Sequence, residues 1–347
     1  MPRIFTIALV FATLLPISRA LPPGPPDAEI TNGLIRAKIH LPDRASGFYR
    51  GTRFDWSGVL YSLEANGHNY YGNWFDQTDP NVHDFIYKDG RIVAGPCSAI
   101  TGPADEFAPV GFDEIKAGET FIKIGVGALT KPNQDKYDNY HLYEISNPGQ
   151  WRITNRPDAV EFVQTLDHLS SGFGYRYEKD VRLTPGKMQM VLRHRIKNIG
   201  TRPINTTVYN HNFLVLDRLP PGPGLTISVP FVISGSHASH TNLAKIEEQK
   251  IIYTKLLSDR DTFATPLSGF GDTATDNSIE IESTSVGAGL RWHTDKPLLR
   301  ESLWSIRSVV AMEPFLAISV APGAEFTWIS VYEYYTVAST LKDTQKP

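Results

Sequence analysis

Residues 175–199 have the sequence YRYEKDVRLTPGKMQMVLRHRIKNI, and this stretch decides the fold class. Two β-forming runs, 175–183 and 188–199, flank the turn segment Thr184-Pro185-Gly186-Lys187. Proline presets the backbone of a turn, and glycine tolerates the positive φ angle that many turns need. The stretch therefore predicts two antiparallel strands joined by a tight connection.

The same pattern continues in both directions from this stretch. Further β runs occupy the middle and the end of the chain, and no helix-length amphipathic segment separates them. Residues 58–65 lead into Asn66-Gly67, the strongest short hairpin signal. We therefore predict an all-β fold, a large antiparallel β-sandwich, forming one domain over residues 30–340.

Two segments leave a choice of local structure. Residues 120–129 are expected to form one strand, with Gly125 and Gly127 marking a bulge or a close approach of another backbone. Residues 244–257 fit either a short helix or a charged hairpin.

The N-terminus has the form of an export signal. Arg3 precedes an apolar run, and Ser18-Arg19-Ala20 resembles a cleavage site, so residues 1–20 are predicted to be a signal peptide. Residues 21–29 are proline-rich and are expected to form a linker. The protein is therefore expected to be secreted or periplasmic, with no integral membrane segment after cleavage, because no later apolar run reaches transmembrane length.

Composition excludes several classes of function. Among 347 residues, 34 Lys and Arg face 37 Asp and Glu, and this balance argues against a nucleic-acid binder. The single cysteine, Cys97, cannot form an internal disulfide or a multi-cysteine metal site and is expected to be structural. No P-loop, dinucleotide-binding, nucleophile-elbow or zinc-protease motif is present, so neither a cofactor nor a metal is expected.

Two segments carry residues suited to proton transfer. His211 lies between Asn210 and Asn212 at the end of a β run, where imidazole can donate or accept a proton near neutral pH. Glu313 ends an apolar strand, where burial would raise the pKa of its carboxyl group. The alternatives are a histidine that only hydrogen-bonds a loop and a glutamate that points into water.

Together these segments resemble the galactose mutarotase (aldose 1-epimerase) superfamily, as a divergent member nearer to its glucose-6-phosphate 1-epimerase branch. Asn210-His211-Asn212-Phe213 and Met312-Glu313-Pro314-Phe315 stand in the places of the family's catalytic His and Glu stretches. The later landmarks follow in the same order, namely Pro322-Gly323, Trp328 and Tyr332-Glu333-Tyr334-Tyr335. The resemblance spans about residues 30–337 and implies a β-sandwich with a sugar cleft on one sheet.

The resemblance also implies a reaction. In the family, Glu removes the proton of the anomeric hydroxyl group while His protonates the ring oxygen, so that the sugar ring opens and closes as the other anomer. Carried over, Glu313 would be the base and His211 the acid, and the partner would be a small sugar or a glycan.

One departure from the family concerns a substrate-binding histidine. Val110 stands where that histidine is expected, and His83 is a possible replacement. Glu106, Asp113 and Glu114 make the surrounding stretch acidic, which would suit neutral sugars better than phosphorylated ones.

Four further residues are candidate sugar contacts. Arg53 could donate to a sugar oxygen or form a salt bridge with Asp55 or another acid. Lys123 could pair with Glu106 and shape the cleft. Asn210 and Tyr175 complete the predicted set.

Three other functions remain open at the level of sequence. One is a glycan-binding sandwich without catalysis, and another is a sandwich with no ligand at all. The third is a lyase or hydrolase acting on a modified sugar, in which Tyr209 or Tyr175 would work with His211 as the base.

Overall fold

A computed structural model of the chain describes residues 24–168, 171–234 and 242–339. The predicted signal peptide, residues 1–20, lies outside the described residues. Strand β1 (Asp27–Thr31) pairs with β2 (Ile35–His40). Its first residues belong to the segment that was expected to be a linker. The first sheet therefore starts three residues earlier than the predicted domain boundary.

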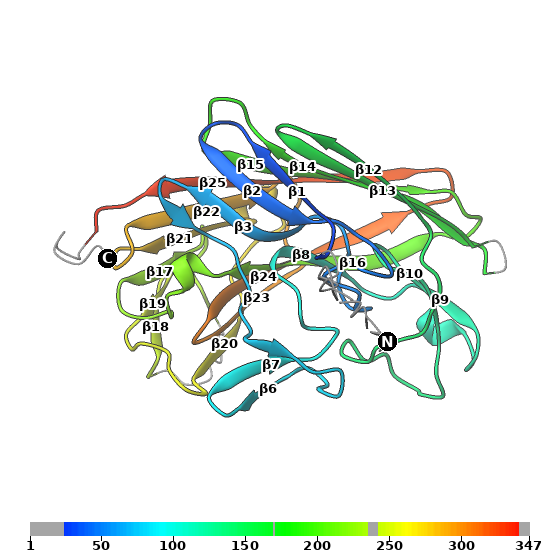
Figure 1. Ribbon diagram of the computed structural model, residues 1–347, viewed down its shortest axis with the longest axis horizontal. Helices are drawn as coiled ribbons and strands as arrows, with labels where there is room; N and C mark the ends of the chain where they lie inside the picture. The colour runs from blue at the N-terminus through cyan, green and yellow to red at the C-terminus, as the bar shows by residue number, and fades with distance from the viewer. Residues whose placement is uncertain (1–23, 169–170, 235–241, 340–347) are drawn as a thin grey trace, which may run out of the picture.

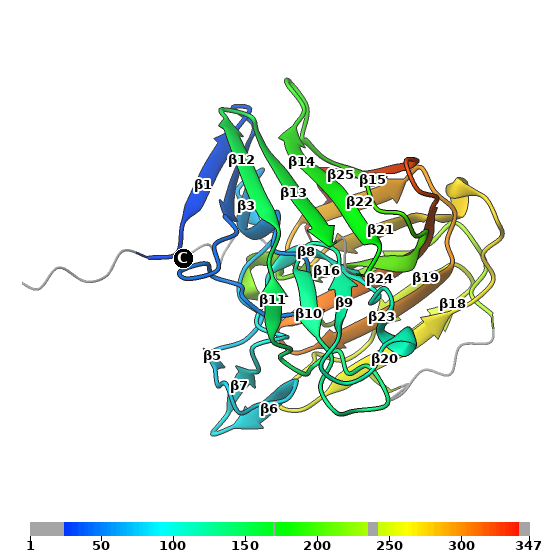
Figure 2. The same ribbon diagram turned by 90° about the vertical axis from the view of Figure 1, so that its right-hand side faces the viewer.

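Two large antiparallel sheets form the body of the molecule and confirm the predicted β-sandwich (Figures 1 and 2). The ten-stranded sheet consists, in spatial order, of β12 (Gln150–Arg156), β13 (Ala159–His168), β14 (Phe173–Leu183), β15 (Gln189–Asn198), β25 (Glu325–Thr336), β22 (Ala288–Thr294), β21 (Ser278–Ser283), β17 (Leu225–Ser228), β19 (Lys250–Tyr253) and β18 (Ala244–Glu247). The five-stranded sheet consists of β20 (Thr262–Leu267), β23 (Arg300–Ile306), β24 (Val309–Val320), β16 (Ile204–Leu214) and β8 (Gly102–Phe107).

Three small sheets and three short 3-10 turns complete the described fold. The first small sheet adds β3 (Val59–Ala65) and β4 (His68–Asn69) to β1 and β2, the second holds β9 (Thr120–Lys123), β10 (Gly127–Thr130) and β11 (Ile145–Asn147), and the third holds β5 (Gln77–Thr78), β6 (Phe85–Lys88) and β7 (Arg91–Ala94). The 3-10 turns are η1 (Phe112–Glu114), η2 (Leu216–Arg218) and η3 (Ala274–Asp276). Within the described ranges, no helix is long and apolar enough to cross a membrane.

The stretch that decided the fold class forms a long hairpin. Strands β14 and β15 pair antiparallel from Tyr175 opposite Asn198 to Leu183 opposite Met190. Alternate side chains of β14 point into the molecule, and Tyr175, Tyr177 and Lys179 are almost fully buried. The period of two that defines a strand thus places one charged residue, Lys179, in the interior.

The segments that sequence left open are both hairpins. Residues 120–129 form two strands rather than the single strand expected, because β9 turns through Gly125 into β10. A Cβ atom on Gly125 would lie 2.5 Å from the Asp55 carboxylate, so the expected close approach is present. Residues 244–253 form the hairpin β18–β19 and not a helix.

Strand β16 is buried on both faces between Val208 and Leu214. One face contacts the ten-stranded sheet, where the hydroxyl group of Tyr332 donates to Asn212 over 2.7 Å. The opposite face carries His211 and Phe213, which stack with ring centroids 3.7 Å apart. Side chains of β16 therefore point alternately into the core between the sheets and towards the opposite face, which carries the candidate site.

Strand β23 places a carboxylic acid in the core between the sheets. Glu301 is 1% exposed, and neither of its carboxyl oxygens has a hydrogen-bond partner among the described residues. Burial raises the pKa of Glu301 from 4.5 to about 8, since the charged form has lost its water and gained no partner. The carboxyl group is therefore neutral at neutral pH.

We expect Glu301→Gln to stabilise the fold at alkaline pH. Because the folded pKa lies above the unfolded one, the contribution of Glu301 to stability is complete below pH 4.5 and is lost as the pH rises through 8. Each pKa unit corresponds to about 1.4 kcal/mol, so the linkage is on the order of 5 kcal/mol. Urea unfolding between pH 5 and pH 9 should show the wild type losing stability relative to the amide variant. Equal pH slopes for the two proteins would contradict this, and exposed Glu64→Gln is the matched control.

Candidate active site

The register of two neighbouring strands brings His211 and Glu313 together. Asn212 of β16 lies opposite Met312 of β24 in an antiparallel pair, so the preceding residue of one strand lies opposite the following residue of the other. The His211 Nε2 atom is 3.1 Å from the Glu313 Oε1 atom. Two residues that are far apart in the sequence are thereby within ion-pair distance of each other.

The His211–Glu313 pair lines a cavity of about 480 Å³. This volume is in the range of small-molecule sites. Its polar wall includes Arg53, Asp84 and Arg300. Its apolar wall is aromatic and includes Trp74, Phe85 and Trp304.

His211 lies in an aromatic environment. Its ring stacks on Phe213. It also makes edge-to-face contacts with Phe54 and Trp304, whose ring centroids lie 5.9 and 5.8 Å from its own. Burial, reinforced by the positive charge of Arg53, holds the pKa of His211 well below its usual value. His211 is therefore a neutral imidazole at neutral pH.

Glu313 is positioned by the next strand of the sheet. The hydroxyl group of Ser302 on β23 donates to Glu313 Oε2 over 2.7 Å. Burial raises the pKa of Glu313, although this hydrogen bond and the charge of Arg53 oppose the shift. The environment thus disfavours the charged form of both members of the pair.

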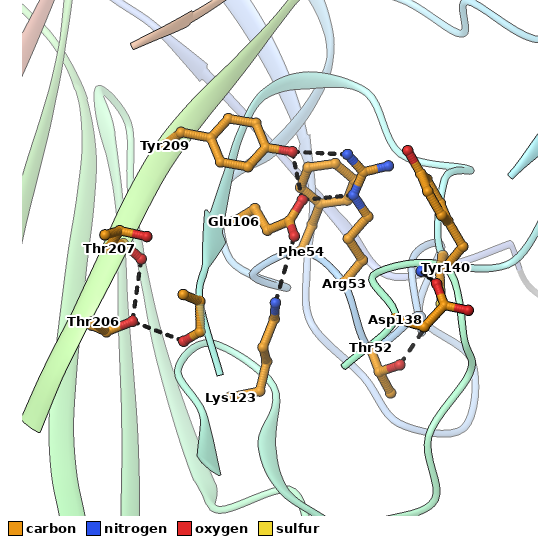
Figure 3. A network of polar contacts seen from close by, with 12 residues as sticks. Thr52, Arg53, Phe54, Glu106, Lys123, Asp138, Tyr140, Thr206, Thr207 and Tyr209 are labelled. Carbon is orange, nitrogen blue, oxygen red and sulfur yellow. Dashed lines mark hydrogen bonds and ion pairs between the residues drawn. The ribbon is translucent and has the colours of Figure 1, made fainter. Parts of the chain in front are cut away.

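Arg53 is held from behind by a buried acid (Figure 3). Its Nε atom donates to Glu106 Oε2 over 2.6 Å, and its Nη2 atom donates to the hydroxyl group of Tyr209 over 2.8 Å. The guanidinium group lies against the rings of Phe54 and Tyr140, 4.5 and 4.8 Å from their centroids. The acid partner of Arg53 is therefore Glu106 and not Asp55.

Lys123 and Glu106 form a layer behind the cavity wall and do not line the cavity, contrary to their expected role as sugar contacts. The expected pair does exist, with 3.7 Å between Lys123 Nζ and Glu106 Oε1. Burial lowers the pKa of Lys123 to about 8. Burial would raise the pKa of Glu106, but Arg53 and Lys123 lower it instead. Glu106 is thus an ionised group that holds Arg53 in place.

Asn210 and Tyr175 also lie outside the cavity. Asn210 faces the opposite side of β16, where its amide donates to Asp105 Oδ1 over 2.9 Å. Tyr175 is fully buried, and its hydroxyl group donates to Gln164 over 2.6 Å. Both residues are buried and neither lines this cavity, so their contact with a sugar stays a prediction.

The tyrosines offered as bases for a lyase are both occupied. Tyr209 donates to Glu106 while it accepts from Arg53, and burial raises its pKa well above the usual value. Tyr175 has no access to the cavity, as described above. The observed geometry therefore favours His211 and Glu313 as the proton-transfer groups.

His83, the expected replacement for the family's histidine, does not line the cavity, whereas the next residue does. His83 is exposed and contacts Asp138, with 2.7 Å between its Nε2 atom and the carboxylate. Its neighbour Asp84 lines the cavity instead and accepts a hydrogen bond from Ser98 over 2.5 Å. The sequence analysis singled out His83 of this dipeptide. In the structure the two neighbouring side chains point in different directions, and the one that lines the cavity is Asp84.

The stretch expected to make the cleft acidic does not do so. Asp113 and Glu114 lie on η1, and Glu114 pairs with Arg202 at the surface. Val110, which stands where the family has a substrate-binding histidine, is buried in an apolar cluster. Among the residues that the structure describes, no group of three or more His, Cys, Asp or Glu side chains is arranged to hold a metal ion.

We expect Glu106→Gln to destabilise the protein by about 3 kcal/mol, because it leaves Arg53 and Lys123 as buried cations without a counter-charge. Urea unfolding at pH 7 measures the change. The matched control is Glu114→Gln, which removes a surface ion pair and should cost less than about 1 kcal/mol. Equal costs for the two variants would show that the buried network adds nothing to stability.

Solved structures share this fold at low sequence identity. The Slr1438 protein from Synechocystis sp. PCC 6803 has a TM-score of 0.53 at 11% identity, covering 93% of this chain and 100% of its own. A galactose mutarotase-like protein from Lactobacillus casei ATCC 334 has a TM-score of 0.51 at 11% identity, covering 89% and 100%. A GalM/aldose epimerase homologue from C. elegans has a TM-score of 0.50 at 15% identity, covering 90% and 99%. No protein-family model and no curated protein matches the sequence. The chain therefore has the galactose mutarotase-like fold that its sequence resembles.

Proposed function

We propose that the chain is a secreted or periplasmic enzyme that interconverts the anomers of an aldose, in the manner of an aldose 1-epimerase. The observation that carries the proposal is the close approach of His211 to Glu313, with 3.1 Å between Nε2 and Oε1, inside a cavity that also presents Arg53 and Asp84. The galactose mutarotase-like fold supports it, because solved structures of that fold include a protein described as an aldose epimerase homologue.

The reaction needs one acid and one base at a single carbon. Ring opening breaks the bond between the anomeric carbon and the ring oxygen, while the anomeric hydroxyl group loses its proton and becomes a carbonyl group. The ring oxygen gains a proton at the same time, so the sugar as a whole gains and loses none. Because both oxygens are bonded to one carbon, an acid and a base that lie side by side reach both of them.

The environment of the pair decides where its proton rests. Burial lowers the pKa of His211 and raises the pKa of Glu313, so both shifts move a proton held by the pair towards Glu313. We therefore assign Glu313 as the acid for the ring oxygen and His211 as the base for the anomeric hydroxyl group. This assignment reverses the one that the family resemblance implies, while the residues are the same.

The remaining wall of the cavity suits a polyhydroxylated ring. Asp84 accepts hydrogen bonds, and Arg53 and Arg300 donate them. Trp74 and Trp304 offer apolar ring surface of the kind that packs against the C–H face of a sugar. Polar groups at one side and aromatic rings at the other would orient the anomeric carbon towards the pair.

We expect the wild type to accelerate the mutarotation of fresh α-glucose or α-galactose, followed by polarimetry or by NMR exchange. His211→Ala and Glu313→Gln should each lower the rate by about 100-fold, the usual share of one acid–base group. Exposed Glu64→Gln is the matched control and should keep the wild-type rate. A wild type no faster than buffer would overturn the proposal, and sugar binding without exchange would favour the glycan-binding alternative.

We also expect His211 to be neutral at pH 7, because its pKa is depressed and the neutral form is the one present above the pKa. The ¹⁵N chemical shifts of histidine-labelled protein measure this directly, with His211→Ala identifying the signal. Exposed His83 provides an internal comparison. Imidazolium shifts for His211 at pH 6 to 7 would restore it as the acid.

A further inference from the structure

A second cavity lies on the other side of one wall of the candidate active site. Its volume is about 550 Å³, and it shares no lining residue with the first cavity. Its walls come from the loop before β3, the end of β5, and the segments 96–99 and 142–145. A cavity of this size can hold a monosaccharide unit.

The wall between the two cavities consists of three chain segments. Arg53, Ser98 and Tyr140 face the first cavity, while their near neighbours in the chain face the second. The neighbours that line the second cavity are Gly51, Pro96, Ala99, Leu142 and Tyr143. The second cavity is therefore a separate site that shares a wall with the first.

Close packing makes this wall rigid. A Cβ atom on Gly51 would lie 2.5 Å from the carbonyl oxygen of Pro96, so only glycine fits there. The hydroxyl group of Tyr49 donates to the carbonyl oxygen of Cys97 over 3.0 Å, and that of Thr52 donates to the carbonyl oxygen of His141 over 3.1 Å. The buried thiol of Cys97 donates to the carbonyl oxygen of His141 over 3.5 Å and contacts Thr52, so this side chain also packs within the wall.

The charge of the second cavity is carried by two arginines. Arg44 donates to the carbonyl oxygen of Ile145 over 3.3 Å, and Arg50 donates to that of Ala45 over 2.9 Å. Neither guanidinium group has a carboxylate within ion-pair distance in residues 24–168, 171–234 and 242–339. Each guanidinium has five N–H donors, so donors remain for a ligand.

The acids near these arginines are engaged elsewhere. Asp43 accepts hydrogen bonds from Ala45 and Ser46, and Asp79, which also lines the cavity, accepts two from Asn81. The pKa of Asp43 is lowered mainly by its hydrogen bonds and to a lesser extent by the charge of Arg50. A guanidinium group that forms no direct ion pair can still bind a carboxylate or a phosphate group on a ligand.

The rest of the lining is apolar and partly open to solvent. Phe48 contributes half-buried aromatic surface, whereas Tyr143 and Trp56 are almost fully buried and form the inner lining. Leu142 is 50% exposed and adds apolar surface at the rim. The second cavity thus combines ring-packing surface with two available cations.

We propose that the second cavity binds an anionic monosaccharide unit, with Arg44 and Arg50 holding its acidic group and Phe48 packing against its ring. The anionic part of this proposal rests on the arginines alone, whereas the saccharide part rests on the proposed function. The rigid wall would place such a unit beside a sugar in the first cavity without direct contact between the two.

Indole signals in ¹⁵N-tryptophan NMR spectra test the two cavities separately. Trp56 lines the second cavity, and Trp304 lines the first. D-glucuronate should shift the Trp56 signal saturably, while D-glucose and acetate at the same concentrations should leave it unchanged. A Trp56 response equal for acetate and glucuronate would overturn the saccharide part, and a response of Trp304 alone would overturn the site.

Variants decide whether the arginines carry the binding. Arg44→Gln combined with Arg50→Gln should weaken the Trp56 response at least tenfold, and Leu142→Glu should weaken it by charge repulsion. Exposed Arg36→Gln is the matched control. Undiminished glucuronate binding in the double variant would refute the proposal.

The outcome is independent of the proposed catalysis. Neither Arg44 nor Arg50 lines the first cavity, so the double variant should keep any anomer exchange that the wild type shows. A protein without anomer exchange that still shows the Trp56 response would refute the proposed function and leave this site standing.

Discussion

The pairing of β16 with β24 is the constraint on which the candidate site depends. β16 is buried on both faces, because one face packs against the ten-stranded sheet and the other forms the floor of the cavity. A slip of one residue would send His211 into the core and Asn210 into the cavity. The two faces are chemically so different that only the observed register satisfies both, and this register is what sets His211 against Glu313.

The same alternation distributes the buried charges. On β8, Asp105 faces the ten-stranded sheet and contacts Lys179 over 2.8 Å, whereas Glu106 faces the other way and holds Arg53. Burial alone would raise the pKa of Asp105, but the charges of Lys179 and His194 hold it below its usual range. Two adjacent acids thus compensate two separate groups of cations, one in the core and one behind the cavity. Glu301 is a contrasting case, since it is buried with no partner among the described residues and stays neutral.

Residues that shape the cavity come from distant parts of the chain and meet in one rigid wall. The loop before β3 supplies Arg53, the segment after β7 supplies Ser98, and the loop before β11 supplies Tyr140. Each of these segments also faces the second cavity with a neighbouring residue. A ligand in either cavity therefore contacts the same short wall, whose hydrogen bonds and glycine contact leave little room for independent movement.

Sequence by itself determined the all-β class, the hairpins around residues 184–187 and 66–67, and the two residues that form the catalytic candidate pair. Local patterning suffices for these features, because turn residues and β-forming runs act over a few positions, and the His and Glu segments match a family pattern. The pairing of Lys123 with Glu106 was also foreseen. Of the predicted contacts, His83, Asn210 and Tyr175 do not line the cavity. Asn210 precedes His211 on β16 and so points to the opposite face, whereas Tyr175 is buried on β14 of the other sheet.

Only the tertiary structure decided which polar residues reach the cavity. Asp84 was not among the predicted contacts, although its neighbour His83 was. Ser302 belongs to no recognisable motif, because its contact with Glu313 depends on the pairing of β23 with β24. The second cavity has no sequence signal either, since its four walls are distant in the chain. The chain thus encodes its strands locally, whereas strand register and the burial of charge, which involve residues far apart in sequence, decide the chemistry of its sites.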